Sequence, residues 1–310
     1  MTIQTVNTII PANNLDMVDA HVHIWAKFKE HITEKSFPAA DDFQLIKENL
    51  LDFKKIGGDL VIDCTPYGCG RDGNKLYELF SETGVEIVCV TGFHRREYYL
   101  SSLGIWDFNL EEASSFFHEE ITEGLKETMN MDRKIKPGLI KIPFLGFLDG
   151  TYKILTDAAI FVAAKTGTPL LIHTEQGLNV EWFSDYLEEK GIKPQKVVFS
   201  HIDKKPDIKL HKKIAAKGYY LEYDTFLRAK YNPEKYTYNL IDSMVKSGFG
   251  DSIMVGSDII NNNMWESIKA GLNYGVFFAK LNQCLLTKYS DPETSLNIMG
   301  RNAIRFLSMK

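Results

Sequence analysis

Histidines stand at the ends of three short apolar segments of the chain, and two of them form an HxH pair. His21 and His23 end the segment 17–23, His173 ends 169–173, and His201 directly follows 196–200. Imidazole nitrogens and carboxylates are the ligands that Zn²⁺ and similar cations take in proteins, and Asp258 follows a further apolar segment. Because residues i and i+2 of a strand face the same side, His21 and His23 can hold one ion together. The pattern predicts a metal site.

Lys141 is an unusual residue for its surroundings, because it lies inside the apolar segment 138–142. Lysine is almost never fully buried without a partner, and burial favours the neutral amine. A neutral amine beside two cations can add CO₂ and become a carbamate, a carboxylate-like group that can bridge both ions. Two alternatives stay open: a lysine whose ammonium reaches solvent, and a buried ion pair with Asp63 or Asp224.

The chain around these residues alternates between strand-like and helix-like segments. Eight short apolar runs are typical of strands buried on both faces; they are 17–23, 60–64, 86–91, 138–142, 169–173, 196–200, 219–223 and 252–256. Eight segments with apolar residues at a spacing of three to four are predicted as helices; they are 42–56, 74–83, 111–129, 153–166, 181–190, 207–216, 234–247 and 265–281.

Strict alternation of eight strands and eight helices favours parallel βα units closed into a (β/α)8 TIM barrel of the α/β class. We expect one domain over residues 1–310, with 1–16 as a short lead-in and 291–310 as a final helix. An open doubly wound sheet is the alternative, but it would carry a glycine-rich phosphate motif after its first strand. In a barrel of this kind the functional groups gather at the carboxyl ends of the strands.

Bulk composition limits the other classes of function. The net charge of −5 gives no sign of a nucleic-acid partner or a basic membrane-binding surface. Four scattered cysteines do not form a disulfide framework, and the N-terminal residues lack the features of a signal peptide. We expect a cytoplasmic protein, no membrane segment, a small-molecule substrate as the partner, and an open possibility of a homodimer.

The order of the HxH pair, Lys141, His173, His201 and Asp258 resembles the amidohydrolase superfamily, and specifically its phosphotriesterase-like family. The middle residue of the HxH pair is valine, where that family usually has glutamate. The resemblance covers nearly the whole chain, and the segments that carry it are DCTPYGCGRD (63–72), PGLIKI (137–142), TGTPLLIHTEQG (166–177), GIKPQKVVFSHIDKKPD (191–207) and NIMGRNAIRFLS (297–308).

The resemblance implies a metal-dependent hydrolase with two divalent ions, which we expect to be zinc. Residue by residue, it implies that the more buried ion is bound by His21, His23 and Asp258, the more exposed ion by His173 and His201, and both by a bridging carboxylated Lys141. Two such ions activate water and polarise the group under attack. Asp258 is also the expected catalytic residue, because a carboxylate there can accept a proton from water and deliver it to the leaving oxygen.

The resemblance further implies a lactonase or carboxylic ester hydrolase that acts on a small lactone, with a sugar-phosphate lactone among the candidates. Arg228, Lys230 and Tyr231 form an R-x-K-Y element like the phosphate-binding one of a lactonase subgroup, and Tyr67 is also expected to contact the substrate. The loop 259–265 has three asparagines where that subgroup places an arginine. The alternatives are a phosphotriesterase or amide hydrolase with the same metals, and a non-catalytic ligand-binding protein.

Overall fold

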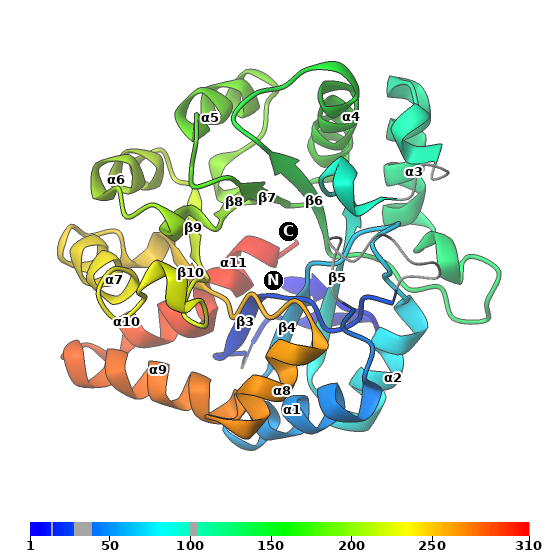
Figure 1. Cartoon of the computed structure of the whole chain (residues 1–310). Coiled ribbons are helices and arrows are strands. Elements are labelled where there is room, and N and C mark those ends of the chain that lie inside the picture. Colours follow the sequence, from blue (N-terminus) through cyan, green and yellow to red (C-terminus); the bar gives the residue numbers. More distant parts are fainter. Residues whose placement is uncertain (14, 28–38, 100–103, 310) are drawn as a thin grey trace.

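Eight parallel strands form one sheet that curves into a barrel, as predicted (Figure 1). The computed structural model describes residues 1–13, 15–27, 39–99 and 104–309. The barrel strands, in chain order, are β3 (Val18–Val22), β4 (Leu60–Asp63), β5 (Glu86–Gly92), β6 (Leu139–Phe144), β7 (Leu170–Thr174), β8 (Val197–Ser200), β9 (Tyr220–Tyr223) and β10 (Ile253–Val255). Each strand pairs with its neighbours in the sequence, so every crossover connects adjacent strands.

Helices surround the barrel and connect its strands (Figure 1). They are α1 (Phe43–Lys55), α2 (Gly73–Thr83), α3 (Leu110–Thr122), α4 (Gly150–Thr166), α5 (Val180–Glu189), α6 (Ile208–Ala216), α7 (Thr237–Lys246), α8 (Asn262–Ala270), α9 (Tyr274–Lys288), α10 (Pro292–Leu296) and α11 (Asn302–Leu307). Short 3-10 turns occupy Arg96–Tyr98, Gly104–Asp107, Lys126–Thr128, Pro194–Lys196, Ile202–Lys204, Ala229–Tyr231 and Gly250–Ser252.

Local sequence fixes several of these helix ends. Asn109 and Glu112 form a reciprocal capping box at the start of α3, which satisfies backbone N–H groups that have no partner within the helix. The ends of α2 and α4 are set by Gly84 and Gly167, which both adopt left-handed backbone angles. Glycine adopts these angles without the steric penalty of a Cβ atom, so both helices end there.

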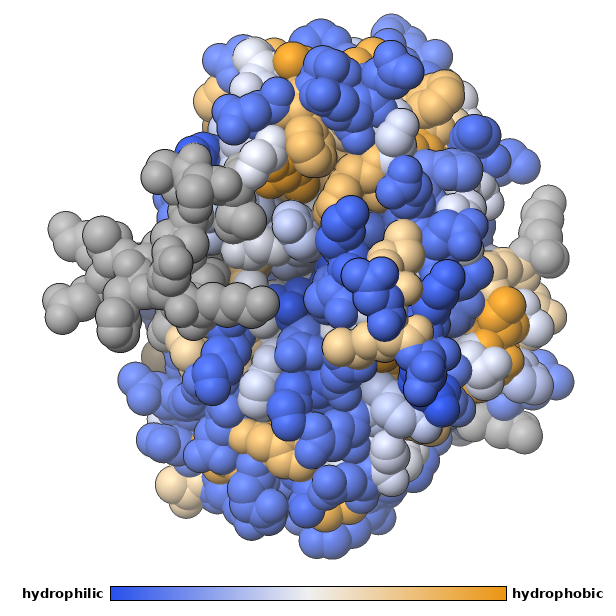
Figure 2. Space-filling view, turned by 90° about the vertical axis from the view of Figure 1, so that its right-hand side faces the viewer, coloured by the Kyte–Doolittle hydropathy of each residue, from blue (hydrophilic) through white to orange (hydrophobic). Residues whose placement is uncertain are grey.

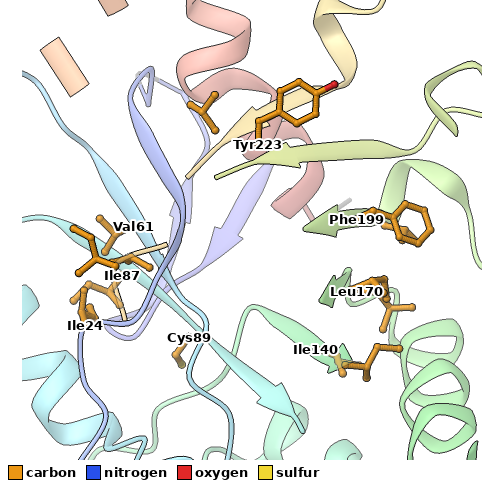
Figure 3. Packing of buried hydrophobic residues seen from close by; sticks show 14 of the residues in the cluster. Ile24, Val61, Ile87, Cys89, Ile140, Leu170, Phe199 and Tyr223 are labelled. Carbon is orange, nitrogen blue, oxygen red and sulfur yellow. The ribbon is translucent and has the colours of Figure 1, made fainter. Parts of the chain in front are cut away.

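Side chains alternate between two buried clusters along each strand. Outward-facing residues such as Ile140, Leu170 and Phe199 pack against the surrounding helices (Figure 3). Inward-facing residues such as Leu139 and Leu171 fill the barrel interior. The period of two that places these residues also decides which polar side chains face the interior.

The seam between β3 and β10 closes the barrel. Backbone hydrogen bonds run from Asp258 N to His21 O and from His23 N to Ile259 O, each 2.8 Å long. The buried Asp19 side chain adds a second connection, because it accepts from the backbone N–H groups of both His21 and Ser257, each at 3.0 Å. One carboxylate therefore joins the first and last strands of the barrel.

Four predicted segments differ in detail from the observed elements. The helix expected over 111–129 ends at Thr122, and a 3-10 turn at Lys126–Thr128 follows Gly124, which has a positive φ of 138°. The helix expected over 265–281 is two helices, α8 and α9, because Asn273 takes a positive φ of 64° and its side chain caps α9. The final helix expected over 291–310 is α10, a π-helical turn (Asn297–Arg301) and α11. The lead-in over 1–16 contains an antiparallel pair, β1 (Thr2–Gln4) and β2 (Ile9–Pro11).

Arg71, in the segment between β4 and α2, is buried with two carboxylates. Its guanidinium donates to Glu120 at 2.5 Å and to Glu127 at 2.7 Å, and it also donates to the Val90 carbonyl oxygen at 2.7 Å. Thr91 donates to Glu120 at 2.6 Å. The network ties this segment to α3 and β5 through charge-assisted hydrogen bonds, which are stronger than neutral ones.

The outer surface on the side of the molecule seen in Figure 2 is largely hydrophilic, with apolar residues in small groups. Among the described residues, no helix combines the length and the apolar character that crossing a bilayer would require.

Gly275 allows α9 to pack closely on α1, which gives a test of the fold. A Cβ atom at Gly275 would lie 2.2 Å from the Asp52 carbonyl oxygen, and backbone cannot move away as a flexible side chain can. Gly275→Ala should therefore lower the free energy of unfolding by about 1–3 kcal/mol, measured by urea denaturation. The matched control is Gly104→Ala, whose new methyl group meets open space and should leave stability unchanged or slightly raised. Equal effects of the two substitutions would contradict the close packing.

Candidate metal centre

The predicted metal-binding residues meet at the carboxyl ends of the strands, where all of them except His21 line one cavity of about 300 Å³. Its lining consists of His23, His94, Arg95, Tyr98, Lys141, His173, Glu175, His201, Lys204, Arg228, Lys230, Tyr231, Asp258 and Ile260. A larger groove of about 820 Å³ runs along the outer surface beside α3 and α4. None of the predicted site residues lines that outer groove, so the smaller cavity is the candidate site.

An irregularity in β3 turns both histidines of the HxH pair toward the cavity side. Val18 and Ala20 face the barrel interior, whereas Val22 faces the helices, so the inward face changes parity within the strand. The pairing of β3 with β4 shifts register between Asp19 and Val22, which is the mark of a β-bulge. Downstream of the bulge the rings of His21 and His23 lie 5.7 Å apart.

Strict alternation places the other ligands. On β6 the inward positions are held by Leu139 and Lys141. On β7 they are held by Leu171 and His173. His201 directly follows β8 and takes a left-handed φ of 61°. Its ring lies 4.6 Å from the rings of His21 and of His173. The structure thus brings four imidazoles from three different strand ends into one group.

In the HxH pair, each imidazole is held through its Nδ1 atom. His21 Nδ1 lies 2.7 Å from a carboxylate oxygen of the buried Glu222, while its Nε2 is buried without a hydrogen-bond partner among the described residues. His23 Nδ1 lies 2.8 Å from the Thr65 hydroxyl, which donates to Asp63 at 3.1 Å. The oxygen partners fix the rings.

The other two imidazoles also have carboxylate neighbours. His173 Nε2 contacts Glu175 at 3.2 Å, and Arg95 donates to the same carboxylate oxygen at 2.7 Å. The remaining His173 nitrogen, Nδ1, is buried without a partner in the described part of the chain. His201 Nδ1 lies 2.8 Å from Asp224 Oδ2, but the angles are not those of a hydrogen bond. Asp224 Oδ2 instead accepts from the His201 backbone N–H at 3.0 Å.

Burial keeps these imidazoles in the form that binds metal. It lowers the pKa values of His21, His23 and His201 well below 6.5 and that of His173 to about 3. The rings are therefore neutral at pH 7, and a neutral ring nitrogen can donate its lone pair to a cation. Burial also raises the pKa of the Glu222 carboxyl, whereas a cation bound beside it would favour the ionised form.

Lys141 is completely buried, and its ammonium donates to the Cys64 carbonyl oxygen at 2.8 Å. The two carboxylates that the sequence offered as ion-pair partners bind elsewhere: Asp63 accepts from Thr65, and Asp224 from the His201 backbone. Strands β5 and β6 approach each other closely here because residue 92 is a glycine. A Cβ atom at Gly92 would lie 2.0 Å from the Lys141 carbonyl oxygen.

Asp258 completes the group at the seam of the barrel. It adopts a left-handed φ of 47°, and its side chain accepts from Arg228 at 2.7 Å. Ligand atoms of His21, His23 and Asp258 lie within 4.8 Å of one another, and so do those of His21, His201 and Asp224. Two such clusters, built from neutral imidazoles and carboxylates, fit divalent cations.

Not every predicted substrate residue lines the cavity. Arg228, Lys230 and Tyr231 do, whereas the Tyr67 ring packs 5.0 Å from Phe116 and under the Arg71 guanidinium.

The asparagines after β10 also have other roles. Asn261 caps α8, and Asn262 accepts from the backbone N–H groups of Asp41 and Asp42. The Asn262 amide also donates to the Asp41 carboxylate at 2.9 Å.

The sequence interpretation missed the residues that hold the imidazoles, of which Glu222 is the clearest. The detectable signal was a glutamate at an inward position of an apolar strand, the same kind of signal that singled out Lys141. His94, whose ring lies 4.8 Å from that of His173, was likewise passed over.

Comparison with known proteins agrees with this geometry. The chain is 28% identical over 279 residues to a phospho-furanose lactonase of Mycoplasmopsis synoviae, covering 82% of this chain and 75% of the relative. It is 23% identical over 258 residues to an aryldialkylphosphatase of Saccharolobus solfataricus, covering 82% and 79%. The crystal structure of a lactonase from Listeria monocytogenes superposes with a TM-score of 0.89 at 21% identity, covering all of both chains.

The model of the phosphotriesterase family matches residues 1–286. The chain therefore belongs to the phosphotriesterase family, whose members are metal-dependent hydrolases.

Proposed function

We propose that the protein is a lactonase that uses two divalent ions, zinc in the first place, to open a small anionic lactone. The observation that carries the proposal is the convergence of four neutral imidazoles, a buried lysine and a carboxylate at the carboxyl end of the barrel. In this proposal the more buried ion is held by His21, His23 and Asp258 and the more exposed ion by His173 and His201. When bound, such a pair of ions activates water and polarises the carbonyl under attack.

We further propose that Lys141 is carboxylated by CO₂ and bridges the two ions. Complete burial supports this role, because a buried ammonium is costly unless it is paired, and among the described residues it donates to a neutral carbonyl oxygen, that of Cys64. The carbamate would replace that buried positive charge with a negative one beside two cations.

Asp258 is the proposed proton acceptor. Its carboxylate lies at the mouth of the barrel beside the HxH pair, and Arg228 contacts both its side chain and its carbonyl oxygen. The guanidinium holds the carboxylate in one orientation, from which it can take a proton from water and pass it to the leaving oxygen.

Charge in the cavity supports an anionic substrate. Arg95, Lys204, Arg228 and Lys230 all line it, against the carboxylates of Glu175 and Asp258. This excess of cations favours a phosphorylated lactone, as in the name of the Mycoplasmopsis relative, over a neutral phosphotriester. We also propose a cytoplasmic location, since all four cysteines are free thiols and such thiols suit a reducing compartment.

Metal content tests the proposed centre. Purified protein grown with zinc should hold close to two ions per chain by elemental analysis, and Lys141→Ala should hold fewer because the bridge is lost. A short carboxylic acid such as propionate should partly restore both metal and activity to this variant. The control is His118→Ala on the outer helix α3, which should keep two ions. Wild-type protein with one ion or none would contradict the dinuclear centre.

Asp258→Asn separates proton transfer from metal binding. The amide keeps the size of the side chain and the other ligands remain, so most of the metal should stay bound. Since asparagine cannot accept the proton, kcat should fall by about 10²–10⁴-fold, measured on a lactone at saturating concentration. Unchanged turnover in a variant that retains its metal would remove Asp258 from the mechanism.

Lys230→Ala tests whether the substrate is phosphorylated. Loss of one charge-assisted contact should raise KM for a phosphorylated lactone about tenfold or more and leave the matched lactone without phosphate unaffected. Lys235→Ala is the control, because Lys235 is an exposed lysine nearby that does not line the cavity. If wild type shows no preference between the two lactones, the phosphate-binding role is wrong.

A further inference from the structure

We infer that Glu222 is a positioning residue of the metal centre: it orients the His21 ring and increases the affinity of the ion that His21 binds. The inference rests on the proposed function, because it concerns how strongly the proposed ions are held.

The position of Glu222 follows from the alternation of β9. Leu221 and Tyr223 pack outward against the helices and Tyr220 faces the barrel interior, so Glu222 also points inward. Both Glu222 and His21 are completely buried, and Glu222 Oε2 lies 2.7 Å from His21 Nδ1. The contact joins strands from opposite ends of the sheet order, β9 and β3.

Judged by its contribution to folding stability alone, Glu222 is an unfavourable residue at its position. Its second oxygen, Oε1, is buried and has no hydrogen-bond partner among the described residues. An unsatisfied buried polar atom costs stability, and the neighbouring strand has Met254 in register with Glu222. An apolar side chain would therefore suit the barrel interior better. A buried group with such a cost calls for another explanation, and such groups often serve function.

The contact with His21 supplies that explanation. When Nδ1–H donates to the carboxylate, the proton is fixed on Nδ1 and the lone pair of Nε2 is free for a cation. His21 Nε2 is itself buried without a partner in the described chain, and the residue His21 belongs to both clusters of possible metal ligands. A carboxylate acceptor also makes the imidazole a stronger ligand than a neutral acceptor does.

His23 offers an internal comparison. Its Nδ1 meets the neutral Thr65 hydroxyl, and the carboxylate of Asp63 follows one hydrogen bond further away. At Nδ1, His21 thus meets a carboxylate directly, whereas His23 meets a hydroxyl. Loss of the Glu222 charge should therefore weaken metal binding without dismantling the site.

The experiment compares Glu222→Gln and Glu222→Leu with wild type. Zn²⁺ affinity is measured by competition with a chromophoric chelator, and thermal stability is measured on the metal-free proteins. Glutamine keeps the hydrogen bond and loses the charge, and it should weaken Zn²⁺ binding about 10–100-fold. Leucine loses both and should weaken binding further, while the metal-free variant should be at least as stable as metal-free wild type.

The control is Glu120→Gln, which alters another buried glutamate, the one paired with Arg71. It should lower thermal stability and leave Zn²⁺ affinity unchanged. Wild-type Zn²⁺ affinity in Glu222→Gln, or a loss of metal-free stability in Glu222→Leu without weaker binding, would overturn the inference. Wild-type protein that binds no Zn²⁺ would instead overturn the proposed function, and the inference with it.

Discussion

The geometry of the barrel mouth depends on the buried carboxylate of Asp19. It accepts hydrogen bonds from the backbone of β3 at His21 and from Ser257 just after β10, and from the Tyr274 hydroxyl. The two backbone donors are His21 itself and the residue before Asp258. The same carboxylate therefore joins the first and last strands and sets the spacing between the ligands His21 and Asp258. It can do so because β3 and β10 lie side by side at the seam of the barrel.

The imidazoles of the site are also held in place by contacts within the protein. One ring nitrogen of each of His21, His23 and His173 contacts an oxygen of the protein. The second ring nitrogens of His21 and His173 have no hydrogen-bond partner among the described residues and are available to a ligand. Because burial keeps the rings neutral, the protein interior tolerates this dense group of basic side chains. The centre is thus organised by contacts that do not themselves involve metal.

The sequence predicted the eight strands, the barrel and the clustering of its site residues, because each depends on local periodicity and on the common direction of parallel strands. It did not predict the partners of the imidazoles. Glu222 is 201 residues from His21, and no spacing rule connects β9 to β3. The bulge in β3 was also missed, since apolar residues lie on both sides of it. Helices α8 and α9 merged in the prediction because their apolar spacing continues across Asn273.

The Arg71 network has a consequence for how the protein responds to salt. Mobile ions screen exposed charges over a Debye length of about 8–10 Å but reach buried pairs much less. The Arg71 and Glu120 side chains are each 1% exposed, whereas Lys47 and Glu82 on the surface are 25% and 40% exposed. The segment after β4 contains Thr65, which contacts His23, and it is anchored by the buried ion pairs of Arg71. A change in ionic strength should weaken these pairs very little. The segment that holds His23 through Thr65 should therefore keep the same conformation at high and at low salt concentration.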